Sequence, residues 1–423
     1  MRRSRRRDTH AYRWLHGIVR PCIRVPMQWY YRIRPTNTGI FRCIRPPYIV
    51  IPNHVMTWDP LLISFYVRDP IHFVASDANF RSSLASWWLR RFGAIAKSKL
   101  RDDFGTLRAV MDLLREGKVV GLFAEGERTW DGTTLPIIPS TAKLVKAANV
   151  PVVVPVLKGA YYSLPRWAFA SRRGKIEIDY RLALTRDEIL RMSVDEIRVR
   201  IERIMYHDED SWQSKNPIGF TSRRAAEPMQ LFLFYCPNCE RLNCLDSKGR
   251  RVFCTECGYK VIFSLYGRFL PGRSSASNTV IYETIRAWAR AQDSYLDTHL
   301  RERASEAGNA SASETDDPLG PEVFHDEHVR LSMGYRMVRP AVQAHGRLAL
   351  HIRGLEFTAT DGVTTRYPWN LINGLNVVYQ AQLEFYHKRK LIVLDFPGRD
   401  TSGYKYLLCG QKLINLGSAP IPD

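Results

Sequence analysis

Short apolar runs alternate with amphipathic stretches between residues 48 and 207, and this alternation limits the folds open to the chain. The runs that predict strands are YIVIP, IHFVAS, KVVGLF, VPVVVPV and KIEIDYRLAL. The stretches that predict helices are DPLLISFYV, RDDFGTLRAVMDLLREG, STAKLVKAAN and one closing helix, TRDEILRMSVDEIRVRIERIMYH. Apolar residues three and four apart mark a helix with one buried face, and strands that alternate with helices build parallel sheets. We therefore predict an α/β sandwich around a largely parallel sheet over residues 46–207.

A basic arm precedes this region. Residues 1–45 hold twelve arginines, no lysine and a single acidic residue, Asp8, within a chain whose formal net charge is +20. Bulky apolar residues such as Trp14, Ile18 and Trp29 lie between the arginines. Arginine binds lipid phosphate while apolar groups enter the headgroup boundary, so this composition predicts docking on an anionic membrane surface. The alternative is a disordered basic tail followed by an amphipathic helix packed on the protein.

The sequence indicates a peripheral protein. It has no run of 18 uncharged apolar residues, so no transmembrane helix is predicted, and arginines interrupt the early apolar residues, so no signal peptide is predicted. We expect the protein to act at the cytoplasmic face of a membrane. Its eight cysteines, in a reducing compartment, favour metal ligands or free thiols over disulfides.

Two histidines are each followed five residues later by an aspartate. His72 and Asp77 lie along IHFVAS, where the odd offset places the two side chains on opposite faces of a strand, about 17 Å apart. His54 and Asp59 lie instead in a connection between a strand and a helix, where a loop can bring imidazole and carboxylate together. There Asp59 could orient the ring and His54 could take a proton from a hydroxyl. The alternative is that Asp59, followed by Pro60, only caps the helix.

Four segments in the same region resemble the motifs of a known family. NHVMTWDP resembles the first motif, Asn-His-x4-Asp, of the glycerolipid acyltransferases, which include the lysophosphatidate acyltransferases. GAIAKSK over 93–99 resembles the second motif, GLFAEGERTWDG over 121–132 the third, and VPVVVPV over 150–156 the fourth. The likeness covers roughly residues 30–207, and the first and third motifs are its more specific parts.

The resemblance implies an O-acyltransferase that acts in phospholipid synthesis. It implies that His54 is the general base and Asp59 its orienting partner, and that Gly126 and Arg128 help to bind an acceptor phosphate in a site shaped by Glu125. The donor would be acyl-CoA or acyl carrier protein, and the acceptor a lysophospholipid hydroxyl, for which 1-acyl-glycerol-3-phosphate is the best candidate. The sequence shows no recognisable nucleophilic Ser or Cys elbow, which favours direct transfer without an acyl-enzyme.

Three residues depart from the family pattern. Lys99, a predicted substrate-binding residue, stands where the second motif usually has Arg, and a lysine lacks the bidentate fork of arginine. Ala124 replaces the usual Pro of the third motif. Glu127 replaces the usual Thr and adds negative charge where an acceptor phosphate would lie. These departures leave open an acyltransferase for a different lipid or for an acceptor without phosphate.

A cysteine-rich segment follows at residues 231–265. Cys236 and Cys239 form one Cys-x2-Cys pair, and Cys254 and Cys257 form a second pair after fourteen intervening residues. This spacing predicts a zinc ribbon with one tetrahedral Zn²⁺. Four thiolates leave no open coordination position, so the zinc would be structural. Cys244 could replace one of the four ligands.

Two regions complete the chain. Residues 266–323 are predicted as a helical and low-complexity linker, with the helix over 281–303. Residues 324–412 are β-rich, with a turn at Asp361-Gly362, and loosely resemble pleckstrin-homology-like or GRAM-type domains. The closing helix of that fold is not evident in the sequence, and the basic cluster of Lys388, Arg389 and Lys390 is interpreted as a solvated hairpin.

Two functions outside catalysis compete with acyl transfer. The net charge and the zinc ribbon suggest a nucleic-acid-binding protein, but the basic excess lies in an arm rich in bulky apolar residues, and we identify no base-stacking platform. Nucleic acid is therefore not expected as a partner. The other alternative is an inactive scaffold that recruits partners through its zinc and β modules.

Overall fold

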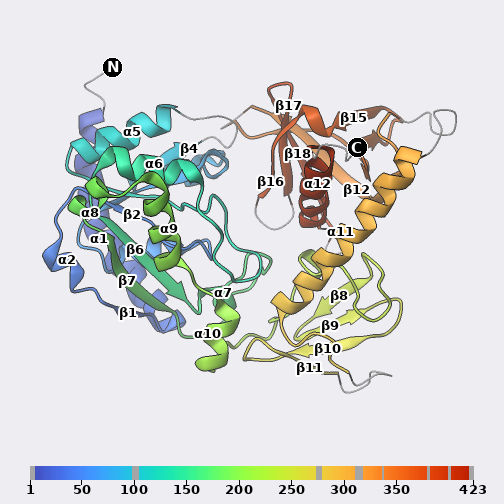
Figure 1. The fold of residues 1–423 in the computed structure, drawn as a ribbon, viewed down its shortest axis with the longest axis horizontal. Helices are drawn as coiled ribbons and strands as arrows, with labels where there is room; N and C mark the ends of the chain where they lie inside the picture. Colours follow the sequence, from blue (N-terminus) through green and yellow to red (C-terminus); the bar gives the residue numbers. More distant parts are fainter. Residues whose placement is uncertain are drawn as a thin grey trace. The chain divides into compact units, whose positions relative to one another are not determined.

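The computed structural model describes residues 5–97, 104–272, 279–309, 318–335, 338–378, 382–398 and 402–418 (Figure 1). The chain divides into two compact units. The first consists of Met1–Arg166, Ala170–Ser222 and Leu265–Gly267, and the second of Trp167–Phe169, Arg223–Ser264 and Arg268–Asp423. The first unit contains the four acyltransferase-like motifs, and the second contains the cysteine-rich segment and the β-rich region.

A seven-stranded sheet with the order β1-β7-β6-β2-β5-β3-β4 forms the centre of the first unit. Its strands are β1 (Arg34–Thr36), β2 (Tyr48–Val50), β3 (Ile71–Ser76), β4 (Ile95–Lys97), β5 (Val119–Gly121), β6 (Val152–Lys158) and β7 (Glu177–Leu184). Neighbouring strands are parallel except β6 and β7, which are antiparallel. The predicted largely parallel sheet is therefore confirmed. Strand β1 comes from the predicted arm, so the arm enters the fold.

The helices of this unit precede and follow the strands in the alternation that the sequence predicts. They are α1 (Arg5–Tyr31), α2 (Ile40–Cys43), α3 (Asp59–Ser64), α4 (Ser83–Arg91), α5 (Phe104–Arg115), α6 (Pro139–Ala148), α7 (Ala160–Ser163), α8 (Arg186–Arg191), α9 (Val194–Met205) and α10 (Glu209–Lys215). Among the described helices, none has the length and apolar content needed to cross a membrane.

The main core lies between the sheet and one layer of helices. Alternate side chains of the central strands, such as Ile49, Val120 and Val154, point to the same face and are almost fully buried. Helices α5, α6, α8 and α9 cover this face with the apolar positions that define their periodicity. The loops that follow β2 and β5 are therefore anchored to a well-packed sheet. These two loops contain the first and third motifs.

The predicted single closing helix over 185–207 is wrong, because the chain forms two helices there, α8 and α9. Met192 is extended between them, and Ser193 caps the second helix by accepting a hydrogen bond from the backbone N–H of Glu196. Thr185 and Glu188 form the same reciprocal capping box at the start of α8. Each box provides partners for the N–H groups of a first helical turn, so it stabilises a new helix start.

The second unit contains two antiparallel sheets and two helices. A four-stranded sheet has the order β11-β10-β9-β8, formed by β8 (Leu245–Lys248), β9 (Arg251–Cys254), β10 (Lys260–Phe263) and β11 (Phe269–Pro271). Strand β11 lies beyond the predicted ribbon boundary at 265. Helix α11 (Ile285–Asn309) corresponds to the helix predicted over 281–303.

The C-terminal sheet has seven strands in the order β15-β14-β13-β12-β18-β17-β16. They are β12 (Glu322–Gly334), β13 (Ala341–His351), β14 (Gly354–Ala359), β15 (Thr364–Pro368), β16 (Ile372–Val378), β17 (Gln382–His387) and β18 (Lys390–Asp395). Asp361-Gly362 forms the predicted turn between β14 and β15, with a positive φ at Gly362. Lys388 and Arg389 form the turn between β17 and β18, and both are exposed, as the solvated-hairpin interpretation requires.

The statement that no closing helix is evident is wrong. Helix α12 (Gly403–Ser418) follows the last strand and contacts β16 and β17. Its buried face includes Tyr406, Leu407 and Leu413 at helical spacing. Lys405 is also buried and forms an ion pair with Asp326 at 2.6 Å. A lysine and glycines among these apolar positions obscure the helical pattern in the sequence, and the pairing partner lies far away along the chain.

Candidate active site and cysteine cluster

The loop between β2 and α3 folds back so that the His54 and Asp59 side chains meet. His54 Nδ1 lies 2.9 Å from Asp59 Oδ2. The same carboxylate oxygen accepts hydrogen bonds from the backbone N–H groups of Val55 at 2.6 Å and Met56 at 3.0 Å. The Asp59 side chain is fully buried, whereas the His54 side chain is 20% exposed. Asp59 therefore fixes the ring and leaves Nε2, which bonds to no described residue, as the nitrogen available to a substrate.

The expectation that Asp59 acts as the N-cap is corrected by the helix boundary. Helix α3 begins at Asp59, its N-cap residue is Trp58, and Pro60 lies in the first turn. The Asp59 carboxylate bonds to the preceding loop rather than to the helix N–H groups that follow. Its partners therefore favour the reading in which Asp59 orients His54 over the reading in which it only caps a helix.

Glu125 connects the two motif loops. Its carboxylate accepts a hydrogen bond from the backbone N–H of His54 at 2.6 Å and another from the N–H of Leu135 at 2.6 Å. Burial raises the pKa of Glu125 to about 8, although the two N–H donors oppose this rise. The backbone N–H of Thr129 adds a third tie by donating to the His54 carbonyl at 3.0 Å. Glu125 thus holds the loop that carries His54 against the third motif, and its hydrogen-bond partners are the backbone N–H groups of His54 and Leu135.

Gly126 and Arg128 lie on the third-motif loop. Gly126 has a φ of +78°, a backbone conformation that favours glycine, and the end of the Ile138 side chain packs closely over it. Arg128 Nη1 donates to Thr57 Oγ1 at 2.8 Å, which brings its guanidinium to the loop that carries His54. Burial and the nearby Arg166 lower the pKa of Arg128 to about 10. The structure therefore brings the residues of the first and third motifs together.

Arg166 joins this cluster, and no sequence signal marked it. Its Nη1 forms an ion pair with Glu127 Oε2 at 2.6 Å and donates to the Arg128 carbonyl at 3.0 Å. Its guanidinium also lies 4.2 Å from the centre of the Trp130 ring. The negative charge that Glu127 adds to the third motif is thus balanced by a buried arginine. Because Arg166 follows the fourth motif in sequence, only the folded chain reveals this pairing.

The surroundings of His54 favour its neutral form. Burial lowers the pKa of His54, the hydrogen bond and charge of Asp59 raise it, and the charges of Arg128 and Arg166 lower it again. The net direction is downward. The ring also stacks on Phe123, with centroids 3.8 Å apart. A neutral imidazole with one oriented nitrogen and one available nitrogen is what a general base near pH 7 requires.

His72 has a different environment. It lies on β3 and is buried, and its Nδ1 lies 3.1 Å from the Gly93 carbonyl oxygen. Asp77 follows the end of the strand in a 3₁₀ turn, Asp77–Phe80. Gly93 has a φ of +71°, and an added Cβ would lie 2.5 Å from the imidazole. The packing of His72 against a turn agrees with the structural role expected from the sequence.

Asn53 is a second residue that sequence reasoning missed, although it belongs to the first motif. Its side-chain amide donates to the Leu157 carbonyl at 3.0 Å, and its side-chain oxygen accepts from the Leu157 N–H at 2.8 Å. These two bonds connect the start of the loop that carries His54 to strand β6. Its place in the motif, directly before the histidine, was the signal available in the sequence. Lys99, the predicted basic residue of the second motif, lies outside the described residues.

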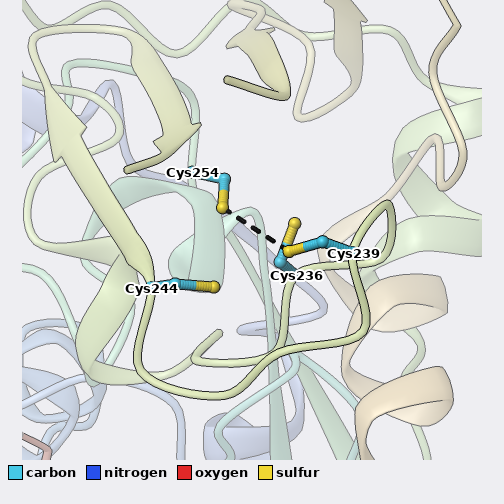
Figure 2. A group of neighbouring side chains, drawn as sticks. All are labelled: Cys236, Cys239, Cys244 and Cys254. Carbon is cyan, nitrogen blue, oxygen red and sulfur yellow. Dashed lines mark hydrogen bonds between the residues drawn. The ribbon is translucent and has the colours of Figure 1, made fainter. Parts of the chain in front are cut away.

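Five cysteines gather in the second unit. The Sγ atoms of Cys236, Cys239, Cys244 and Cys254 all lie within 4.8 Å of one another (Figure 2). Cys257 Sγ lies 3.7 Å from Cys236 Sγ. The closest group of four therefore has Cys244 in the place predicted for Cys257, while the other three predicted ligands are brought together as expected. Such a group of thiols can hold a soft or borderline metal ion.

The two Cys-x2-Cys pairs have the same backbone structure. Cys236 and Cys254 donate their N–H groups to the carbonyls five residues later, Arg241 and Tyr259, at 2.9 and 2.8 Å. The residue after each pair, Glu240 or Gly258, has a positive φ. These turns aim N–H groups at sulfur: Cys254 Sγ accepts from the N–H of Cys257 at 3.4 Å.

The sulfur atoms of Cys257 and Cys244 differ in their hydrogen bonds. Burial raises the pKa of Cys257, but bonds from the Tyr259 backbone N–H and from Asn238 bring it down to about 7. Cys244 instead donates its thiol hydrogen to the Arg241 carbonyl at 3.3 Å, and burial raises its pKa. A hydrogen-bond donor directed at sulfur stabilises a thiolate, and the Cys257 sulfur accepts such a bond from Asn238 whereas the Cys244 sulfur donates one to a carbonyl.

Two comparisons relate the chain to known proteins. Residues 33–158 match the family model described as Acyltransferase. Among solved structures the chain is similar to the 1-acyl-sn-glycerophosphate (LPA) acyltransferase PlsC from Thermotoga maritima, with 18% identity and a TM-score of 0.38 over 48% of this chain and 95% of that one. No curated protein matches the chain in sequence. The family match spans the His54–Asp59 pair and the loop of Glu125 to Arg128, so both motif loops lie in a segment that is similar to an acyltransferase domain.

Proposed function

We propose that the protein transfers a fatty acyl group from acyl-CoA or acyl carrier protein to the hydroxyl of a lysophospholipid, with 1-acyl-glycerol-3-phosphate as the preferred acceptor, in phospholipid synthesis. The observation that carries this proposal is the His54–Asp59 pair, held beside Arg128 by Glu125 and Thr57. It puts a neutral base and a cationic group on neighbouring loops. A lysophospholipid presents a matching pair, a hydroxyl and a phosphate, on one small glycerol.

The chemistry follows from the positions of the groups. His54 Nε2 takes the proton of the acceptor hydroxyl while the oxygen attacks the thioester carbonyl carbon. The tetrahedral intermediate then breaks its carbon–sulfur bond, and the protonated imidazole returns its proton to the leaving thiolate. Asp59 stabilises the imidazolium through Nδ1 during this interval. The product is the ester, and the released thiol belongs to the donor.

The charges around Arg128 support a phosphate-bearing acceptor. Arg166 forms an ion pair with Glu127 and so compensates its negative charge. The charge of Arg128, which bonds to Thr57, therefore remains available to a phosphate. A planar guanidinium can grip phosphate with two parallel hydrogen bonds.

Replacing Arg128 with Lys is expected to raise the Michaelis constant for lysophosphatidate about 10-fold, because lysine keeps the charge but loses the bidentate fork. The donor's constant should change little. Steady-state kinetics with each substrate varied in turn measures both constants. Arg203→Lys, an exposed substitution on α9, is the matched control and should leave both unchanged. A raised donor constant beside an unchanged acceptor constant would move Arg128 to the donor side.

The acceptor itself is tested by mass spectrometry. Purified protein is given labelled acyl-CoA and a panel of lysophospholipids, with a monoacylglycerol as the acceptor that lacks phosphate. The labelled acyl chain is expected on lysophosphatidate. Preferential labelling of the monoacylglycerol would indicate a non-phosphate acceptor, and labelling of no lipid at all would favour the scaffold alternative.

We also propose that the cysteine cluster holds one structural Zn²⁺ through Cys236, Cys239, Cys254 and Cys257. The matching turns of the two cysteine pairs and the N–H groups directed at their sulfurs support this set. Four thiolates would complete a tetrahedral site and connect the two loops of a small sheet.

Membrane docking is proposed for helix α1. Exposed apolar residues follow one another at helical spacing on this helix, with Ile18, Val25 and Trp29 exposed to 49%, 69% and 67%. Helix α4 contacts α1 and exposes Leu84 and Trp87 as well. These side chains could enter the interface of the bilayer that contains the acceptor.

The structure changes how this docking is best tested. Deleting residues 2–34 would remove buried Ile33 and the first residue of β1, and would thus damage the sheet. Substituting Ile18, Val25 and Trp29 together with Gln leaves these elements in place. We expect binding to anionic vesicles to weaken about 10- to 100-fold, because three partly inserted apolar side chains are lost.

The control for this prediction substitutes exposed apolar residues on α8, α9 and the segment after them, Leu190, Val199 and Tyr206, with Gln. Vesicle binding of this control should match wild type in a sedimentation assay. Wild-type binding should weaken with added salt without vanishing, since screening acts on the arginines and not on apolar burial. Equal binding by both triple variants would place the docking surface elsewhere.

A further inference from the structure

A groove beside helix α1 is lined by arginines that the proposed reaction does not use. It has a volume of about 440 Å³, and Arg20, Arg24 and Arg68 line it together with Gln28, Phe41 and Tyr66. Arg20 and Arg24 lie one helical turn apart on α1, and Arg68 follows the end of α3. The groove is therefore built from the arm and from the segment that follows the catalytic loop.

The positive charge in this groove has no carboxylate counter-ion among the described residues. Arg20 donates to the Phe65 carbonyl, and Arg24 Nε donates to Gln28 Oε1 at 3.3 Å. The Arg24 guanidinium lies 4.6 Å from the centre of the Tyr66 ring. The two cations lie one helical turn apart in a partly desolvated place, and burial together with the charge of Arg24 lowers the pKa of Arg20. An anion in the groove would remove this cost.

The orientation of α1 connects the groove with the membrane face. Arg20 and Arg24 point toward the protein, because they contact Phe65 and Tyr66, whereas Val25 and Trp29 point outward. This arrangement is unlike that of a helix whose arginines simply face solvent or lipid headgroups. The outward apolar side chains can contact acyl chains, and the inward arginines can bind a phosphate. Together they suit a molecule that carries both groups.

We propose that Arg20, Arg24 and Arg68 bind the phosphate of an anionic phospholipid from the bilayer on which α1 docks. The aromatic walls, Phe41 and Tyr66, would contact its glycerol and upper acyl chains. This second lipid site deepens the proposed function and rests on its membrane docking. Helix α1 would thus bind one phospholipid of the bilayer while the acceptor occupies the His54 site.

The test replaces Arg24 and Arg68 together with Gln and measures binding of water-soluble dihexanoyl phosphatidylglycerol by calorimetry, because phosphatidate is the product of the proposed reaction and would also bind beside Arg128. Charged hydrogen bonds are lost at two positions, so affinity should fall about 30-fold. The charge-matched control replaces Arg42 and Arg45, both exposed and outside the groove, and should lose less than about 3-fold. Arg68→Gln alone, which removes no hydrogen bond or ion pair with a described residue, should weaken binding in a protein that melts like wild type.

Three results would overturn the proposal. Equal losses in the groove and control variants would mean diffuse electrostatic attraction. Failure of the wild-type protein to bind the soluble phosphatidylglycerol would mean that no such site exists. Tight binding of coenzyme A that is lost in the same groove variants would assign the phosphate to the donor and not to the membrane. The calorimetry requires neither acyl transfer nor vesicles, so a protein without transferase activity could still confirm the groove.

Discussion

Replacing His54 with Ala is expected to lower the rate of acyl transfer by about 100- to 10,000-fold while leaving the fold intact. Nε2 of this ring is the nitrogen that Asp59 leaves available, and the neighbouring cationic groups, Arg128 and Arg166, cannot act as bases near pH 7. Because the His54 side chain is partly exposed, its loss creates little cavity. Turnover of labelled acyl-CoA, together with the melting temperature, measures both parts of the prediction.

His72 supplies the comparison. His72→Ala should reduce stability, since the ring is buried against Gly93, but turnover per folded molecule should stay close to wild type. If both variants lost the same turnover at equal folded fraction, the assignment of the base to His54 would be refuted.

The pH profile distinguishes a base from a merely structural residue. A general base works in its neutral form, and the pKa of His54 is lowered by burial and by two arginines, against the opposing effect of Asp59. The rate should therefore be at its plateau at pH 7 and should fall only below the ordinary histidine range, about 6.5. A rate that kept rising well above pH 7 would contradict a lowered pKa at this base.

The second large effect is expected at the cysteine cluster. Purified protein should contain one zinc per chain, and Cys254→Ser should lose it, because three thiolates hold the ion far less tightly than four. Structural zinc in small domains contributes on the order of 10 kcal/mol of folding free energy, so the second unit should melt at a much lower temperature. Elemental analysis and thermal unfolding with and without a chelator measure these two results.

The contacts around the first cysteine pair indicate which other part of the second unit should lose stability when zinc is lost. Gln292 Oε1 on α11 accepts hydrogen bonds from the N–H groups of Phe234 and Tyr235 at 2.8 and 3.1 Å, and Trp288 Nε1 donates to the Tyr235 carbonyl at 2.8 Å. The chain that leads into the cysteine cluster is thus bound to α11. Loss of zinc should therefore also loosen α11, which hydrogen exchange would detect.

Two further variants separate the candidate fourth ligands. Cys257→Ser should lose zinc as Cys254→Ser does, whereas Cys244→Ala should keep it, because the Cys244 sulfur bonds to the Arg241 carbonyl while the Cys257 sulfur accepts a hydrogen bond from Asn238. The opposite outcome, with zinc lost only in the Cys244 variant, would assign the fourth position to Cys244, as the spacing of the sulfur atoms allows.

Patterns among residues close together in the sequence predicted several features of the fold and of the candidate sites. The alternation of apolar runs predicted the parallel sheet of the first unit, the Asn53-His54 segment followed by Asp59 predicted the paired side chains, and the two Cys-x2-Cys pairs predicted a cluster of thiols. Each of these features depends on residues close together in the chain, whose spacing is fixed by the geometry of a strand, a loop or a tight turn. The break between α8 and α9 also depends on neighbouring residues, because Ser193 and Glu196 form the capping box that starts α9.

Only the tertiary structure decided which distant groups meet. Glu125 bonds to the backbone of a residue 71 positions away, and the Asn53 side chain to one 104 positions away. Arg166 neutralises Glu127, and the α1 arginines turn inward to a groove instead of facing outward. Periodicity along the sequence carries no information about such partners, because they are chosen by strand order and by the need to pair charges and polar groups as they leave water.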